Sequence, residues 1–279
     1  MTGFTTSYGV KLPWIIYGTA WKKEQTKDLV IEALKAGFNG IDTACQPKHY
    51  NEGMVGDAIT SFKEHGLKRE DIYIQTKFTP LAGQDTTSIP YDKNALIFDQ
   101  VLQSFEKSKE NLKTNYTDTL IMHSPVFPHS LFMEAWSAME KIYRRGGARQ
   151  LGISNCYETK TLERLYKDAT VKPAVLQNRF YQESGYDVEL RNFCSKSKIL
   201  YQSFWTLTAN GHILNSYLIK DIAKKYDKTK PQIFFRYLNQ SGILPLTGTC
   251  SVQHMKEDLQ VLEFELSKEE LTAIDSILF

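Results

Sequence analysis

The chain has 279 residues, of which 42% are hydrophobic and 24% charged, as in a globular protein with a sizeable core. Its net charge of +2 is spread without basic runs, so neither nucleic acid nor an anionic membrane is an expected partner. No apolar run approaches the roughly 20 residues that span a bilayer, and the first residues do not resemble a signal peptide, so we expect a cytoplasmic protein.

Four cysteines are present, at positions that match neither a disulfide framework nor a metal-binding motif. Cys45, Cys156 and Cys250 follow predicted strand ends, where we expect small reduced side chains of the core or the rim. Redox sensing is the alternative interpretation of these thiols. We expect no bound metal.

Short apolar runs alternate with amphipathic segments along the chain. Residues 5–13 form two short arms around Tyr8-Gly9, which predicts a hairpin that closes one end of the fold. The apolar runs predict strands at residues 14–17, 38–42, 72–77, 119–123, 150–153, 174–177, 199–203 and 242–246. Helical periodicity predicts helices at residues 24–36, 52–64, 95–112, 134–142, 158–168, 187–197, 214–226 and 231–238, with two more at 254–259 and 268–278.

This alternation is typical of an α/β protein with a closed parallel (β/α)8 TIM barrel, formed as a single domain over residues 1–279. No G-x-G-x-x-G motif follows a strand, which argues against a Rossmann domain. The long loop at residues 78–93 is rich in Pro, Gly, Asp and Thr. Because it follows a strand end, we expect it to form part of a binding pocket.

Polar and ionisable side chains follow three of the predicted strands. Asp42, Lys77 and His123 end the second, third and fourth strands, and Tyr50 lies in the loop after Asp42. In a parallel barrel every strand delivers its last residues to one open face, so these four side chains are expected to converge. Taken singly, they have structural explanations: a helix cap, a rim charge, a core histidine and a packing tyrosine.

Taken together, the four residues resemble the Asp, Tyr, Lys and His tetrad of the aldo-keto reductase family. The resemblance extends from Gly18-Thr19 to about Leu266. It implies an enzyme that reduces a small-molecule aldehyde or ketone with NADP(H), in preference to NAD(H), and that acts as a monomer.

Carbonyl reduction needs a proton donor within hydrogen-bond reach of the substrate oxygen, and Tyr50 is the expected donor. The ammonium of Lys77 is expected to lower the pKa of this phenol, and Asp42 to hold Lys77 in place. His123 is expected to orient the carbonyl. Residues 45–49 make a longer bridge between Asp42 and Tyr50 than is common in the family, and they bring His49 beside Tyr50 as a candidate substrate contact.

Further residues match the family's cofactor site. Ser154, Asn155 and Gln177 offer the donors and acceptors that suit the carboxamide of nicotinamide, and Phe204 replaces the family's stacking tyrosine. The other residues that the resemblance places against the cofactor are Gly18, Thr19, Leu207, Thr208, Thr247, Gly248, Thr249, His254, Glu257 and Asp258. Leu246 and His254 stand in place of the usual Lys and Arg, which weakens recognition of the 2′-phosphate of NADP.

Aromatic residues at or beyond strand ends are candidates for the substrate pocket: Trp21, Phe78, Tyr91, Phe127 and Trp205. Core packing is the alternative for each of them. Two other functions remain open: a non-enzymatic or regulatory member of the family that only binds cofactor, and a barrel hydrolase with Asp42 and Glu52 as an acid pair. The second alternative leaves Lys77 and His123 without a role.

Overall fold

The computed structural model describes residues 3–63 and 66–278 of the chain. Eight parallel strands close into a barrel in the order β10-β3-β4-β5-β6-β7-β8-β9, which confirms the predicted (β/α)8 fold. The strands are β3 (Ile16–Gly18), β4 (Gly40–Asp42), β5 (Tyr73–Phe78), β6 (Thr117–Met122), β7 (Ala148–Ser154), β8 (Val175–Arg179), β9 (Leu200–Phe204) and β10 (Ile243–Thr247).

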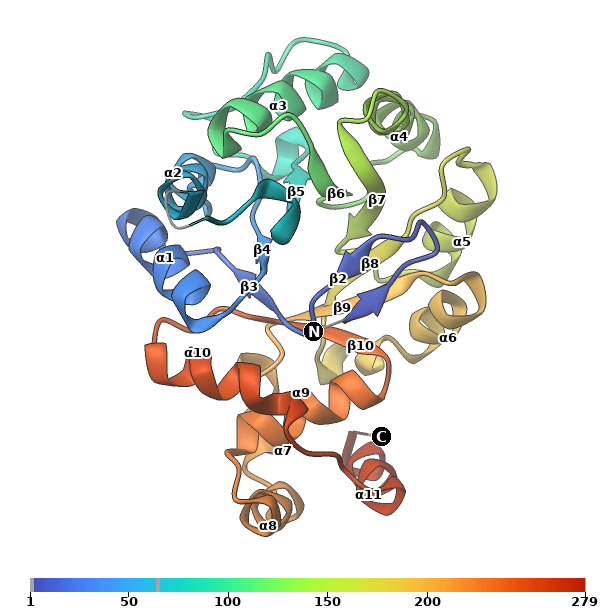
Figure 1. The fold of residues 1–279 in the computed structure, drawn as a ribbon. Helices are drawn as coiled ribbons and strands as arrows, with labels where there is room; N and C mark the ends of the chain where they lie inside the picture. Colours follow the sequence, from blue (N-terminus) through green and yellow to red (C-terminus); the bar gives the residue numbers. More distant parts are fainter. Residues whose placement is uncertain (1–2, 64–65, 279) are drawn as a thin grey trace.

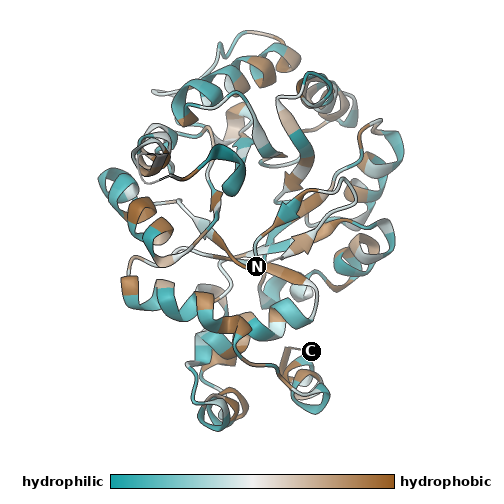
Figure 2. Ribbon diagram, in the orientation of Figure 1, coloured by the Kyte–Doolittle hydropathy of each residue, from teal (hydrophilic) through white to brown (hydrophobic). Residues whose placement is uncertain are grey.

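Helices surround the barrel (Figure 1) and place apolar side chains against its strands. They are α1 (Thr26–Ala36), α2 (Glu52–Lys63), α3 (Ile97–Leu112), α4 (His129–Arg144), α5 (Thr159–Asp168), α6 (Val188–Ser197), α7 (Gly211–Leu214), α8 (Tyr217–Tyr226), α9 (Lys230–Gln240), α10 (Val252–Leu259) and α11 (Lys268–Leu278). Figure 2 shows hydrophilic and hydrophobic residues side by side on these helices, as expected where one face meets the barrel and the other meets water. No helix in the described ranges is long and apolar enough to cross a membrane.

The predicted elements differ from the observed ones mainly at their ends. The helix predicted at residues 214–226 is two helices, because the Ser216 hydroxyl accepts a hydrogen bond from the Ile219 amide and so caps a new helix at Tyr217. The helix predicted from residue 134 begins earlier, at His129, directly after Pro128. Glu64, the predicted last residue of the second helix, lies outside the described residues.

The N-terminal hairpin closes one end of the barrel, as predicted. Strands β1 (Phe4–Thr5) and β2 (Lys11–Leu12) pair antiparallel and lie in front of the barrel in Figure 1. The Thr6 hydroxyl donates to Gln150 Oε1 at 2.5 Å, and the Tyr8 hydroxyl donates to the Lys172 carbonyl at 2.9 Å. The carboxyl ends of the strands therefore meet at the opposite, open end of the barrel.

A layer of glutamine amides fills the barrel interior below that open end. Gln75 and Gln177 both donate from Nε2 to Gln202 Oε1, at 2.9 and 3.0 Å. The same Nε2 atoms also donate to Asp42 Oδ1, at 2.7 and 3.0 Å. Because these side chains are buried, their amides must be paired within the protein, and the pairing fixes the position of Asp42.

Helices α2 and α3 approach each other closely at Gly56, where a Cβ atom would lie 2.0 Å from the Asn111 carbonyl oxygen. We predict that Gly56→Ala lowers the free energy of unfolding by about 1–3 kcal/mol, because the backbone of α3 must move. Gly53→Ala in the same helix is the matched control, since its Cβ would meet nothing closer than 3.7 Å. Urea denaturation measures both variants, and equal effects would contradict the prediction.

Candidate active site

Asp42 and Lys77 form a buried ion pair at the open end of the barrel. Lys77 Nζ donates to both oxygens of Asp42 at 2.7 Å and to the Thr43 carbonyl at 2.9 Å. The two side chains are 4% and 1% exposed, so water does not screen this interaction. Burial lowers the pKa of Lys77, while the charge of Asp42 opposes that shift. The predicted partnership of these residues is present.

Tyr50 lies against this pair. Lys77 Nζ is 5.1 Å from the centroid of the Tyr50 ring, and the rings of Tyr50 and His123 meet edge to face with their centroids 6.0 Å apart. The Tyr50 hydroxyl makes no hydrogen bond with any described residue, and Tyr50, His123 and Asp42 line one cavity. The four residues predicted to converge are therefore together, with Lys77 behind the cavity wall.

The expected effect of Lys77 on the phenol is not found. Burial and the charge of Asp42 raise the pKa of Tyr50 above its ordinary value. The ammonium lies over the ring face, and its hydrogen bonds are directed to Asp42 and Thr43, so it does not lower the pKa as predicted. Tyr50 is consequently a protonated phenol at neutral pH, which is the form that can donate a proton.

His123 is a neutral imidazole that follows β6. Burial, and then the charge of Lys77, hold its pKa well below the ordinary value. Thr79 Oγ1 lies 2.6 Å from His123 Nδ1, and the Asn155 amide donates to the His123 carbonyl at 2.8 Å. In the tautomer in which the Thr79 hydroxyl donates to Nδ1, the ring proton is on Nε2, and the imidazole can donate from that atom.

The cavity has a volume of about 800 Å³. Its lining includes these predicted cofactor residues: Gly18, Ser154, Asn155, Gln177, Phe204, Leu207, Thr208, Thr247, Gly248, Thr249, His254, Glu257 and Asp258. Leu246 lines it as well. Thr19 does not, because its hydroxyl is buried and donates to the Asp42 carbonyl at 2.9 Å. Thr19 therefore connects β3 to Asp42 and does not face the cavity as predicted.

Several aromatic predictions are wrong. Phe78 and Tyr91 are buried against each other, with ring centroids 5.6 Å apart, and neither lines the cavity. The Tyr91 hydroxyl donates to the Thr79 carbonyl at 2.8 Å, which folds the loop at residues 78–93 onto the barrel instead of around the pocket. Phe127 is 69% exposed and also lies outside the cavity lining.

Trp21 and His49 form one rim of the cavity, as predicted. Their ring centroids are 3.7 Å apart, and the Trp21 amide donates to the His49 carbonyl at 2.7 Å. Burial lowers the pKa of His49, so this ring is neutral at neutral pH. Trp205 lies in the lining too and is 48% exposed. The cavity lining is therefore rich in aromatic rings.

The lining also includes Lys22, Gln46, Arg179 and Cys250, which are not among the predicted site residues. Lys22 Nζ donates to the Gly248 carbonyl at 2.6 Å and lies 3.6 Å from Cys250 Sγ. Arg179 follows Gln177 by two residues, so the two-residue repeat of a strand could have placed both on one face. No pattern in the sequence links Lys22 to Cys250.

The lining groups fit a nicotinamide cofactor. Gln177 Nε2 donates hydrogen bonds to Asp42 and Gln202. Its Oε1 accepts no hydrogen bond from the described part of the chain. That oxygen remains available for an amide N–H. The Phe204 ring lies in the same cavity wall, where it suits stacking.

The arrangement does not suit a hydrolase. Glu52 is buried and accepts hydrogen bonds from Thr76 and Asn111, and it does not line the cavity. Asp42 is bound to Lys77. An acid pair of Asp42 and Glu52 facing a common substrate is thus absent from the described residues.

Comparisons with known proteins agree with this geometry. The model of the aldo/keto reductase family matches residues 11–278. Glyoxal reductase of Bacillus subtilis is 32% identical over 273 residues, which cover 96% of this chain and 90% of that protein. The 7-acetyl-epi-neemfruitin B aldo-keto reductase of Melia azedarach is 30% identical over 298 residues, with coverage of 97% and 87%. The crystal structure of an aldo/keto reductase from Brucella melitensis has a TM-score of 0.83 at 29% identity and covers 99% of this chain and 100% of that chain.

Asp258 is a buried acid whose ionisation should affect stability. Burial raises its pKa from 3.8 to about 7, although the Thr247 hydroxyl donates to it at 2.7 Å. Folding therefore takes up a proton between these two pH values, and this residue's contribution makes the free energy of unfolding fall as the pH rises through that window.

We predict that Asp258→Asn removes this contribution. The free energy of unfolding of the variant, minus that of the wild type, should therefore be larger above pH 7 than at pH 4. Asp221→Asn, an exposed residue of α8, is the control and should follow the wild type. Denaturant titrations across this pH range give the result. Parallel curves for the wild type and Asp258→Asn would contradict the assignment.

Proposed function

The chain belongs to the aldo/keto reductase family of oxidoreductases, and on this premise we propose that it reduces aldehydes or ketones to alcohols with NADP(H). The observation that carries the proposal is the convergence of Tyr50 and His123 on one cavity in front of the buried Lys77–Asp42 pair. Two neutral donors beside a buried cation suit a carbonyl oxygen that becomes negative during the reaction.

In this proposal the carbonyl oxygen accepts hydrogen bonds from the Tyr50 hydroxyl and from His123 Nε2. When bound, the reduced nicotinamide supplies the hydride to the carbonyl carbon. As negative charge develops on the oxygen, Tyr50 transfers its proton there, because an alkoxide is a stronger base than a phenolate. A proton from water then restores the phenol, because burial and the charge of Asp42 disfavour the phenolate.

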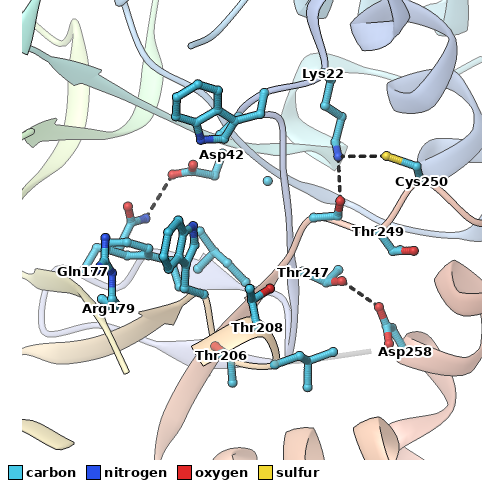
Figure 3. Close-up of a pocket in the computed structure, with 18 of the residues that line it drawn as sticks. Lys22, Asp42, Gln177, Arg179, Thr206, Thr208, Thr247, Thr249, Cys250 and Asp258 are labelled. Carbon is cyan, nitrogen blue, oxygen red and sulfur yellow. Dashed lines mark hydrogen bonds between the residues drawn. The ribbon is translucent and has the colours of Figure 1, made fainter. Parts of the chain in front are cut away.

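The protein would hold the cofactor against residues of the cavity lining. Gln177 and Asn155 are available to the carboxamide, and Phe204 to the nicotinamide ring. On the other side of the cavity, Lys22, Thr247 and His254 line the region assigned to the adenosine phosphate. Figure 3 shows Asp42 and Gln177 across the cavity from Lys22 and Asp258, so the cavity can accommodate an extended molecule between them.

The proton-donor role of Tyr50 gives a direct test. We predict that Tyr50→Phe lowers kcat for an aldehyde by about 10²–10⁴-fold, because the positioned donor is lost. The Kd for NADPH, measured by fluorescence titration, should stay almost unchanged. Tyr226→Phe removes a phenol from α8 that bonds Glu270, and it should retain wild-type activity. Full activity of Tyr50→Phe would refute the assignment.

The preference for NADP(H) rests on His254 and Lys22, since no arginine lies in that part of the lining. We predict a higher kcat/KM with NADPH than with NADH. His254→Ala should reduce that ratio by about 10–100-fold, as expected for the loss of one hydrogen bond to a charged group. His129→Ala changes a histidine paired with Asp168 outside the lining and serves as the control. A tenfold preference of the wild type for NADH would overturn the proposal for the cofactor.

A further inference from the structure

Arg179 is a cation of the cavity lining with no acidic partner. It ends β8, two residues beyond Gln177, and lines the same cavity as Tyr50 and His123. Within residues 3–63 and 66–278, no carboxylate forms an ion pair with it, and no described side chain or carbonyl accepts a hydrogen bond from its guanidinium. Its Nε is shielded from solvent and without a partner. A shielded donor of this kind costs free energy unless a ligand satisfies it.

The other cations of the cavity region are already engaged. Lys77 is bound to Asp42, and Lys22 donates to the Gly248 carbonyl at 2.6 Å. Five other arginines have carboxylate partners: Arg69 and Arg149 with Asp118, Arg144 with Glu140, Arg164 with Asp168 and Arg236 with Glu265. Arg179 differs from these five in lacking such a partner, and from the exposed Arg145 in lining the cavity.

Aromatic rings hold the guanidinium in place. The strand register pairs Arg179 with Phe204, and the next residue, Trp205, has a positive φ of 55°. Arg179 Cζ is 4.1 Å from the centroid of the Trp205 ring and 5.2 Å from that of Tyr181. The Tyr157 hydroxyl accepts from the Arg179 backbone amide at 3.2 Å. Ring contacts of this kind use the faces of the guanidinium and leave the N–H groups in its plane free to donate.

A guanidinium held in this way matches a carboxylate, which can accept two parallel N–H hydrogen bonds. Figure 3 shows Arg179 on the side of Gln177 and across the cavity from Lys22 and Cys250. The residues assigned to the cofactor phosphate lie on that other side. The position of Arg179 therefore favours the substrate over the cofactor as the source of the anion.

We propose that Arg179 binds a carboxylate of the carbonyl substrate, so that the enzyme prefers oxo acids to neutral carbonyl compounds of the same shape. This inference rests on the proposed function. It adds a specificity-determining residue that contacts the substrate but exchanges no proton or hydride with it.

The test compares an acid with its methyl ester, using succinic semialdehyde and terephthalaldehydic acid as the two acids. We expect the wild type to have a higher kcat/KM for each acid than for its ester. Arg179→Gln should lower kcat/KM for the acids by about 10–100-fold, as expected for a hydrogen-bonded charge pair, and leave the esters almost unchanged. Arg179→Lys should restore part of the loss. Arg164→Gln, on the outer surface of α5, is the control variant.

Two further measurements separate this proposal from its alternatives. Raising the salt concentration should increase KM for the acids and not for the esters, because salt screens the charge pair. The Kd for NADPH should be the same in the wild type and in Arg179→Gln. A rise in that Kd, or an equal loss of kcat/KM for acid and ester, would assign Arg179 to the cofactor and overturn the proposal.

Equal activity of the wild type and Arg179→Gln on the acids would also overturn it, and the proposed function would stand. A wild type that reduces neither acids nor esters with either cofactor would remove both.

Discussion

The ion pair between Lys77 and Asp42 is the interaction on which the active site depends. Asp42 accepts hydrogen bonds from Lys77, Gln75 and Gln177, so one carboxylate links β4, β5 and β8 inside the barrel. Breaking such a pair on one side leaves an uncompensated buried charge, at a cost of about 3–5 kcal/mol. The pair therefore holds the ammonium under the Tyr50 ring in a fixed position, and the glutamine layer below it prevents the carboxylate from turning away.

Loss of hydration decides the protonation states around the cavity. Tyr50 and His123 are partly buried, and desolvation raises the pKa of the phenol and lowers that of the imidazole, so both are neutral. A site with a free cation would have favoured the phenolate, which accepts a proton and cannot donate one. Here burial and the charge of Asp42 keep the proton on Tyr50.

The cavity lining has chemically different parts. Polar groups of β10 and α10 form one of them, where Thr247 is bonded to Asp258. Trp205 and Arg179 lie together in another, and Trp21 and His49 form a second pair of rings. This division follows from the barrel, because each strand end contributes to the part of the open face nearest to it. The loops after the strands then determine which ligands fit.

The sequence by itself determined the barrel and the convergence of the residues proposed to be catalytic. Apolar runs of strand length ended in Asp42, Lys77 and His123, and a parallel barrel brings all its strand ends to one face, so these side chains could be placed together without coordinates. The hairpin was also predictable from Tyr8-Gly9. Both inferences depend on local pattern and on topology.

Tertiary structure alone decided the orientation of the side chains. The sequence could not show that Lys77 lies over the ring face of Tyr50, that Tyr91 folds the loop at residues 78–93 away from the cavity, or that Trp205 covers Arg179. Each of these contacts joins residues that are far apart in the chain or separated by a turn. Their geometry is set by packing and by the pairing of buried polar groups, which act across strands and leave no periodic pattern in the sequence.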